Sequence, residues 1–208
     1  MNHIIYLIRH AQTEANALGK YIGVTDEPLS SEGIKELETY IKGGCYPSVD
    51  YVFVSPKQRC LQTREKIYGR LPYEIIPELA ECNFGLFENK NYNQLKNTIE
   101  YQEWLHAGAQ GDFPQGEKIE DFKTRCEMGF AKAVNIIMNK KIKSSAFIIH
   151  GGTIMAILTK YALAKAFFHD WKVKNCEGYR LVLDPLLWQR EKKILEVSKI
   201  QDIESRSL

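Results

Sequence analysis

Short apolar runs alternate along the chain with longer segments in which apolar residues recur every three or four positions. The runs predict strands, because a strand that is buried on both faces of a parallel sheet is apolar at every position. The predicted strands are Ile4–Ile8, Tyr51–Val54, Tyr73–Ile76, Ala146–Ile149, Tyr179–Leu183 and Ile194–Ile200. The last two follow one another closely enough to allow an antiparallel hairpin.

The segments between these runs have the periodicity of amphipathic helices. The predicted helices are one capped by Ser30 or Ser31 and ended by Gly43-Gly44, one that opens near Pro56 and carries Arg59, one from Glu117 to about Asn139, and one over Thr153–Ala164. Strands that alternate with helices indicate an α/β fold.

The region from 82 to 116 differs from the rest, since it is rich in Asn, Gln, Gly and aromatic residues. It contains a candidate helix around Tyr92–Trp104 and leaves from the carboxyl end of a predicted strand, so it could form a lid or wall over a site there. No linker rich in Pro, Gly or Ser divides the 208 residues. We therefore expect a single domain, 1–208, with 82–116 as an excursion over the site.

Composition restricts the class of protein. A formal net charge of +2 with no basic stripe argues against a nucleic-acid partner. No apolar stretch approaches the ~20 residues that a membrane span needs, and Ile4–Ile8 is too short for the core of a signal peptide. The five cysteines show no C-x-x-C pair and no metal-ligand spacing, so we expect reduced thiols and a cytoplasmic location. We also expect neither a metal nor a cofactor, because the sequence shows no cluster of carboxylates that could hold a metal ion.

Chargeable residues lie just after several of the predicted strands. Arg9-His10 follows the first strand, Arg59 comes shortly after the second, Glu81 after the third, and His150 closes the fourth. Ligands of open parallel sheets bind outside the carboxyl ends of the strands. Two histidines, two arginines and a carboxylate at that edge predict a site for an anionic substrate.

The individual motifs suit phosphate chemistry. Arg9 beside His10 disfavours the imidazolium, and a neutral histidine is a competent nucleophile towards phosphorus. A guanidinium also matches two phosphate oxygens. Arg59 lies in the first turn of its predicted helix, where the backbone favours an anion. The glycines after His150 let backbone N–H groups approach a ligand.

Each motif also has a simpler interpretation, which the residues alone leave open. The pair Arg9-His10 could merely end a strand, and Arg59 could be a solvated helix residue. Glu78 and Glu81 are both candidate carboxylates, and either could lie on the surface. His150 could be a histidine satisfied within the core.

Taken together, the order and spacing of five elements resemble the histidine phosphatase superfamily, also called the phosphoglycerate mutase-like family. The resemblance extends from Leu7 to about Gly152. The elements are Arg9-His10-Ala11-Gln12-Thr13 with Asn16, Gly23 to Ser30, Ser55 to Thr63, Glu81-Cys82-Asn83-Phe84-Gly85, and His150-Gly151-Gly152.

The resemblance implies a fold and a mechanism. The fold would be a three-layer α/β/α arrangement whose six-stranded sheet is mostly parallel, with one antiparallel strand. The activity would be that of a metal-independent phosphomonoesterase, acting on a small phosphorylated metabolite as a monomer or homodimer. The implied roles are nucleophile for His10, proton donor for Glu81, phosphate binding for Arg9, Asn16, Arg59, His150 and Gly151, and a candidate substrate contact for Gly23.

Departures from the family pattern refine this interpretation. Ala11 replaces the usual glycine, and its methyl group could narrow the approach of the backbone to phosphate. Cofactor-dependent mutases typically read Glu-Arg-His-Tyr-Gly at the element that starts at Glu81, and carry further arginines in a longer excursion. Here no arginine lies between Arg70 and Arg125, which favours a phosphatase over a mutase.

The stretch from Trp104 to Arg125 looks like that of α-ribazole-phosphate phosphatases, although Gln115 and Lys118 break the pattern. α-Ribazole 5'-phosphate is therefore a candidate substrate. The alternatives are a phosphoglycerate mutase and a non-catalytic module that binds phospho-ligands.

Overall fold

The computed structural model describes residues 1–108 and 111–200. Its centre is a six-stranded sheet in the order β3-β2-β4-β1-β5-β6. The strands are β1 (His3–Arg9), β2 (Tyr51–Val54), β3 (Tyr73–Ile75), β4 (Ser144–Ile149), β5 (Gly178–Leu183) and β6 (Glu196–Lys199). Strands β1 to β4 pair in parallel, whereas β5 is antiparallel to both of its neighbours. The expected mostly parallel sheet with one antiparallel strand is confirmed.

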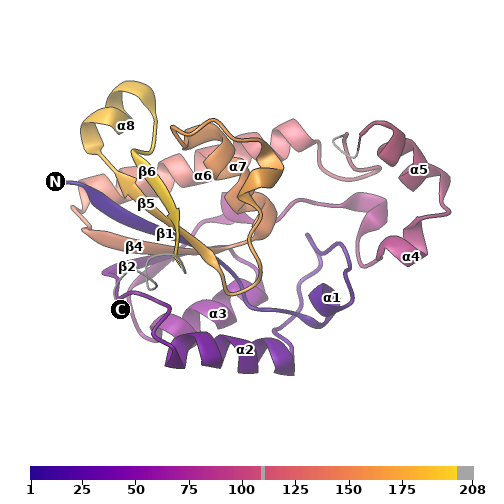
Figure 1. The fold of residues 1–208 in the computed structure, drawn as a ribbon, viewed down its shortest axis with the longest axis horizontal. Coiled ribbons are helices and arrows are strands. Elements are labelled where there is room, and N and C mark those ends of the chain that lie inside the picture. The colour runs from indigo at the N-terminus through magenta and orange to yellow at the C-terminus, as the bar shows by residue number, and fades with distance from the viewer. Residues whose placement is uncertain (109–110, 201–208) are drawn as a thin grey trace.

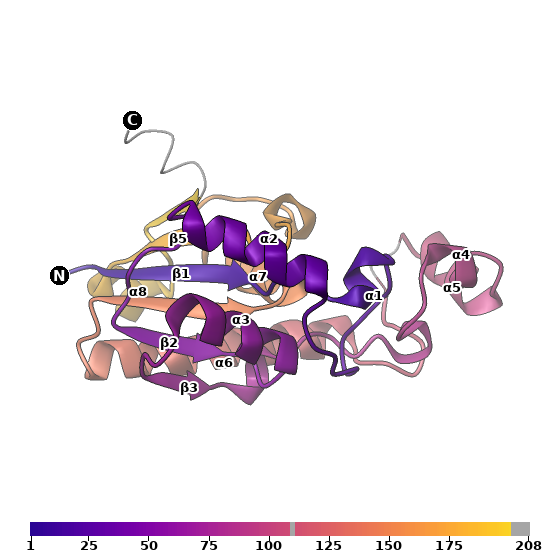
Figure 2. The same ribbon diagram turned by 90° about the horizontal axis from the view of Figure 1, so that it is seen from below.

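Helices cover both faces of the sheet (Figures 1 and 2). One face carries α2 (Ser31–Lys42) and α3 (Gln58–Tyr68), and the other carries α6 (Ile119–Asn139), α7 (Gly151–Tyr161) and α8 (Pro185–Glu191). The alternation of side chains along a strand supplies both cores. Leu7 packs in the cluster that contains Phe130 of α6, and Ile8 packs in the cluster that contains Cys60 of α3. This is the three-layer α/β/α architecture.

Most helix ends follow the expected signals. Ser30 caps α2, because its Oγ accepts a hydrogen bond of 2.9 Å from the Gly33 N–H. Helix α3 begins at Gln58 and thus places Arg59 in its first turn. No helix among the described residues is both long enough and apolar enough to cross a membrane.

The end of the chain differs from the prediction in two places. The helix expected over Thr153–Ala164 ends at Tyr161, because Ala162 turns into an extended conformation and forms a parallel bridge with Ile194. The hairpin of β5 and β6 is present, but its connection holds α8. Asp184 caps α8 by accepting a hydrogen bond of 2.7 Å from the Leu187 N–H.

The excursion extends past the carboxyl edge of the sheet (Figures 1 and 2). It holds the 3-10 helix η2 (Gly85–Phe87) and two helices, α4 (Tyr92–Leu95) and α5 (Ile99–His106), where one helix was expected. Its aromatic residues pack around Tyr21, which follows the short helix α1 (Glu14–Ala17). The rings in contact with Tyr21 are those of Phe84, Phe87, Trp104 and Phe113.

Candidate active site

The predicted motifs meet at the carboxyl edge of the sheet. Strands β2, β4 and β1 are adjacent and parallel, so Ser55, His150 and His10 follow neighbouring strands at one edge. The ring centroids of His10 and His150 are 5.1 Å apart. Arg59 reaches this point from α3, and Glu81 from the loop after the 3-10 helix η1 (Pro77–Leu79).

His10 is held as a neutral nucleophile. Its Nδ1 lies 2.7 Å from the Ala11 carbonyl oxygen, and because a carbonyl only accepts, the hydrogen is on Nδ1. Nε2 therefore carries the free electron pair. The ring is buried, and this burial, helped by the charges of Arg59 and Arg9, lowers the pKa of His10 well below its usual value.

Arg59 is a fully buried cation. Its guanidinium donates to the carbonyl oxygens of Thr25 (2.9 Å), Gly23 (3.3 Å) and Ile22 (3.4 Å). Within the described part of the chain it forms no salt bridge, and its buried Nε has no hydrogen-bond partner. Burying an unpaired charge is costly, so the arrangement indicates a place for an anion. The alternative of a solvated surface arginine is wrong.

Arg9 also has a buried guanidinium nitrogen without a partner in the described part of the chain. Its Nη1 donates to the Val173 carbonyl oxygen at 2.9 Å, and its Nε is buried without a partner among the described residues. Burial lowers the pKa of Arg9, partly offset by the charge of Glu81. Gly151 lies against this guanidinium, since a Cβ at Gly151 would be 3.5 Å from the Arg9 Nε. The first N–H groups of α7 thus face the same region.

His150 is oriented by Ser55. The Ser55 Oγ accepts a long hydrogen bond of 3.4 Å from the Lys57 N–H and lies 2.7 Å from the His150 Nε2. The hydroxyl can therefore donate to Nε2, which places the ring hydrogen on Nδ1, 3.9 Å from the Cys60 Sγ and able to donate to a ligand. Burial, followed by the charge of Arg59, lowers the pKa of His150 well below its usual value. Ser55 is a supporting residue that the sequence motif contained but did not identify.

The structure distinguishes between the two candidate carboxylates. Glu81 lines the pocket beside Arg9, whereas Glu78 forms an ion pair of 3.2 Å with Lys132. The Glu81 carboxylate accepts hydrogen bonds from the N–H groups of Cys82 (3.0 Å) and Gly152 (3.1 Å). Burial nevertheless raises the pKa of Glu81 above its usual value, against those hydrogen bonds and the charges of Arg59 and Arg9.

The space for a side chain is smaller at Gly152 than at Gly151, and only Gly151 was a predicted site residue. A Cβ at Gly152 would collide with the Glu81 carboxylate. Only glycine allows this backbone N–H to reach the acid so closely. The second glycine of the His-Gly-Gly element therefore shapes the position of Glu81.

Arg125 of α6 holds the loop that carries Glu81. Its Nη1 donates to the carbonyl oxygens of Glu78 (2.9 Å) and Ala80 (2.7 Å), and its Nη2 donates to that of Glu81 (2.9 Å). Glu117 completes the arrangement with a bidentate pair to Arg125 at 2.6 and 2.8 Å. The roles of Arg125 and Glu117 were not predicted, because their contact with the loop depends on the tertiary fold.

Asn175 links Asn16 to the backbone of His10. The Asn175 Nδ2 donates to the His10 carbonyl oxygen (2.9 Å) and to the Asn16 Oδ1 (3.3 Å). Asn16 Oδ1 also accepts from the Thr13 N–H, so its Nδ2 is left to donate to a ligand. Asn175 was not predicted, since it precedes β5 without a recognised motif.

Two other predicted positions have roles inside the protein. The Gly23 N–H donates to the Glu88 carboxylate, and its carbonyl oxygen accepts from Arg59. The substrate contact expected of Gly23 stays a prediction. The methyl group of Ala11 packs with Leu29 and Leu37 in a buried cluster, so it replaces the usual glycine without entering the site.

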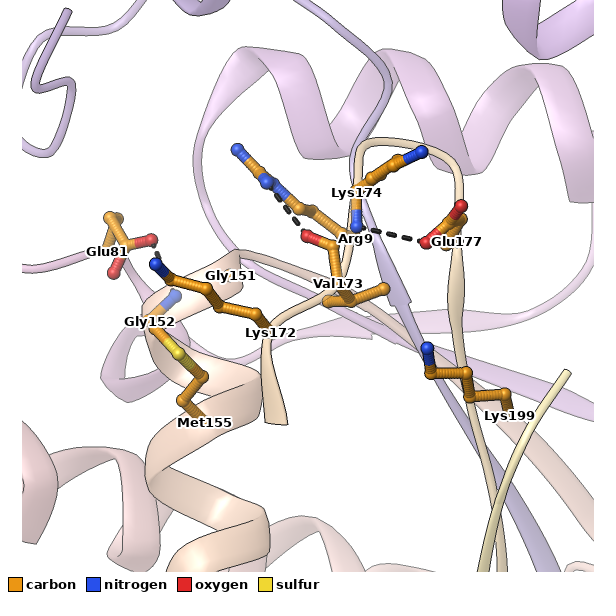
Figure 3. A pocket seen from close by; sticks show the side chains of 10 residues that line it. All are labelled: Arg9, Glu81, Gly151, Gly152, Met155, Lys172, Val173, Lys174, Glu177 and Lys199. Carbon is orange, nitrogen blue, oxygen red and sulfur yellow. Dashed lines mark hydrogen bonds between the residues drawn. The ribbon is translucent and has the colours of Figure 1, made fainter. Parts of the chain in front are cut away.

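A cavity of about 480 Å³ opens beside Arg9 and Glu81 (Figure 3). Gly151 and Gly152 form part of its wall, and Lys172 and Lys199 are among its other lining residues. This volume suits a small metabolite. No group of three or more His, Cys, Asp or Glu side chains within residues 1–108 and 111–200 is placed to hold a metal ion.

Comparison with known proteins agrees with this geometry. The family model of the histidine phosphatase superfamily (branch 1) matches residues 5–193. The chain therefore belongs to the histidine phosphatase superfamily, and it is an enzyme of that family.

The relatives carry names of different activities. The adenosylcobalamin/alpha-ribazole phosphatase of Escherichia coli (strain K12) is 32% identical over 135 residues, which cover 62% of this chain and 65% of that protein. A protein of Photorhabdus laumondii named probable phosphoglycerate mutase is 25% identical over 201 residues, or 93% of this chain and 91% of its own. The crystal structure of the alpha-ribazole phosphatase from Shigella flexneri has the same fold, with a TM-score of 0.74, 22% identity, and coverage of 88% of this chain and 91% of that chain.

Proposed function

We propose that the protein is a phosphomonoesterase that acts on a small phosphorylated metabolite through a phosphohistidine, without a metal ion. The observation that carries the proposal is the surroundings of His10. Its free Nε2 lies in the field of two guanidinium groups, Arg9 and Arg59, each with a buried Nε that lacks a partner among the described residues. An anion that contains an electrophilic phosphorus atom fits all three groups.

The first step forms the phosphoenzyme. The His10 Nε2 attacks phosphorus, and the bond from phosphorus to the ester oxygen breaks. Arg9, Arg59 and the His150 Nδ1–H hold the non-bridging oxygens, whose charge persists in the transition state. Glu81 gives its proton to the leaving alcohol, for which its raised pKa suits it.

The second step restores the enzyme. The Glu81 carboxylate takes a proton from water, the water oxygen attacks phosphorus, and the bond from phosphorus to His10 breaks. Inorganic phosphate leaves, and both residues return to their starting protonation states. A pure binding module has no use for a nucleophile paired with an acid, so the set of groups favours an enzyme over that alternative.

Two of the activities named among the relatives provide substrates to test. α-Ribazole 5'-phosphate enters as a candidate through the 32% identical phosphatase. Phosphoglycerate mutase activity is the alternative, since a relative of that name covers 93% of the chain. A mutase would depend on a bisphosphate and would return the phosphoryl group to a second hydroxyl rather than to water.

A panel of phosphomonoesters, including α-ribazole 5'-phosphate and 3-phosphoglycerate with bisphosphate, tests the proposal. We expect release of inorganic phosphate and a protein-bound phosphoryl group that can be trapped by rapid quenching. His10→Ala should lower the rate by more than about a thousandfold and abolish the trapped species, because the covalent route is lost. Its circular dichroism should match that of the wild type. Retention of several per cent of activity would rule out the covalent mechanism.

A further inference from the structure

The cavity beside Arg9 and Glu81 has a cationic wall that the proposed chemistry does not use. Three lysines line it, namely Lys172, Lys174 and Lys199. In Figure 3, Lys172 lies on the Glu81 side, and Lys174 and Lys199 lie on the far side of Arg9 and Val173. The cavity therefore joins Arg9 and Glu81 to positively charged surroundings, whereas the buried His10, Arg59 and His150 do not line it.

The sheet topology explains why these lysines gather here. Strand β6 pairs antiparallel with β5, which pairs antiparallel with β1, so the carboxyl ends of β6 and β1 lie at the same edge. Lys199 is the last residue of β6, and Arg9 is the last residue of β1. Lys172 and Lys174 belong to the segment that enters β5 at this same edge. The lysines are thus fixed to the site by the backbone, even though their side chains are exposed.

The charge of this wall is not neutralised within the protein. Five other Lys and Arg side chains of the described residues form ion pairs with glutamates, but none of these three lysines does. Two carboxylates also face the cavity. Glu177 accepts a hydrogen bond of 3.2 Å from the Lys174 backbone N–H, and Glu81 is the group to which the mechanism assigns a proton. The positive charges of the lysines and Arg9 exceed these.

We propose that Lys172, Lys174 and Lys199 form a subsite for a second anionic group, so that the preferred substrate is a phosphomonoester that also carries a carboxylate or a second phosphate. This inference rests on the proposed function, since it assumes that Arg9 holds the reacting phosphoryl group. A monoester without a second charge leaves the lysines in contact with water only. A doubly anionic ester spans both parts of the cavity and gains the added attraction.

Binding of non-hydrolysable phosphonates tests the subsite independently of turnover. The probes are propylphosphonate, 3-phosphonopropionate and propane-1,3-diphosphonate, which share a three-carbon chain and differ in the second group. The affinities are measured by calorimetry at about 0.15 M ionic strength. The screening length there is about 8 Å, so attraction between distant charges contributes little to the measured affinity. We expect one or both of the doubly anionic probes to bind about fivefold or more tightly than propylphosphonate. A single exposed ion pair contributes up to about 1 kcal/mol, or about fivefold in affinity. The better of the two probes identifies the second group as carboxylate or phosphate.

The triple variant Lys172→Gln, Lys174→Gln, Lys199→Gln should remove this preference and change the affinity for propylphosphonate by less than about twofold. A control variant carries Lys35→Gln, Lys42→Gln and Lys143→Gln and therefore removes the same total charge. These three lysines are exposed and do not line this cavity. It should keep the preference.

Two results would overturn the subsite while the proposed function stands: equal affinity for all three probes, or equal weakening of all three probes in the triple variant. If no phosphonate binds and no ester is hydrolysed, the proposed function fails, and the subsite fails with it.

Discussion

The hydrogen bond from the His10 Nδ1 to the Ala11 carbonyl oxygen determines which ring nitrogen can react, and burial determines its charge. The active form needs an unprotonated His10 and a protonated Glu81. The pKa of His10 lies well below the ordinary 6.5, and the pKa of Glu81 lies above the ordinary 4.5. Activity should therefore rise with pH through the first value and fall with pH through the second.

We expect kcat to show an acid limb below pH 6.5, where His10 loses its proton, and an alkaline limb above pH 4.5, where Glu81 loses its own. The bound phosphate dianion moves the second limb further up, because it disfavours a neighbouring carboxylate. The measurement is kcat against pH for an alkyl phosphate, whose leaving oxygen needs the Glu81 proton; kcat at saturation does not depend on the ionisation of the free substrate. Glu81→Gln should remove the alkaline limb alone. An unchanged alkaline limb in this variant would assign it to another group.

The role of Glu81 as proton donor also predicts a dependence on the leaving group. An alkyl oxygen needs a proton to depart, whereas an aryl oxygen of low pKa does not. Glu81→Gln should slow an alkyl phosphate by about 10²- to 10⁴-fold and an aryl phosphate far less. Glu78→Gln is the matched control, because Glu78 is paired with Lys132 outside the site. If Glu78→Gln shows the leaving-group dependence instead, the wrong acid has been named.

Arg125 of helix α6 positions the loop that carries the proposed proton donor, Glu81. Arg125 binds three carbonyl oxygens between Glu78 and Glu81, and Glu117 holds its guanidinium from the other side. Lysine cannot make these contacts together, because it lacks the planar fork of donors. Arg125→Lys should therefore displace Glu81 and lower kcat for an alkyl phosphate by up to about a hundredfold. The aryl phosphate should be affected less, as for Glu81→Gln.

The control for this prediction is Lys132→Gln, which removes another cation of α6 that touches only the Glu78 side chain. It should leave both rates within about twofold, as expected for an exposed ion pair. Thermal unfolding of both variants separates lost stability from lost positioning. Equal losses on alkyl and aryl esters in Arg125→Lys would show that the arginine supports the site in general and not the acid.

The elements differ in how far the sequence specifies them. Strands β1 and β4 are predictable because their apolar runs are buried on both faces, and α2 is predictable from its Ser30 cap. Helix α8 was not predicted, although Asp184-Pro185 is a recognisable start signal. The end of α7 could not be read locally, because Ala162 stops the helix by pairing with Ile194, 32 positions away in the sequence.

At the scale of the whole molecule, the charged residues of the site were predictable from the sequence, but the residues that hold them in position were not. His10 and His150 directly follow strands and Arg9 ends one, so the sheet topology brings these three to one edge; Arg59 and Glu81 follow their strands by a few residues and reach the same edge from α3 and from the loop after η1. Ser55, Asn175, Arg125 and Gly152 act through contacts that form only when distant segments pack. The lysines of the cavity wall carried no motif, and only the pairing of β6 with β5 places Lys199 beside the end of β1.

The anion-binding groups of the site belong to the fold, which leads to a prediction for the intact enzyme. The two arginines Arg9 and Arg59 are fixed by backbone carbonyls, and the neutral His150 is fixed by Ser55, so these groups are in place whenever the chain is folded. Exhaustive dialysis against EDTA should then leave kcat within about twofold, because no step draws on a bound metal as Lewis acid or source of hydroxide. Vanadate should inhibit competitively, since its oxygens can occupy the places of the phosphoryl oxygens around an attacked centre. Arg59→Ala should weaken vanadate and substrate together. Loss of activity on chelation that a divalent ion restores would mean that a metal, and not the arginine pair, neutralises the phosphoryl group.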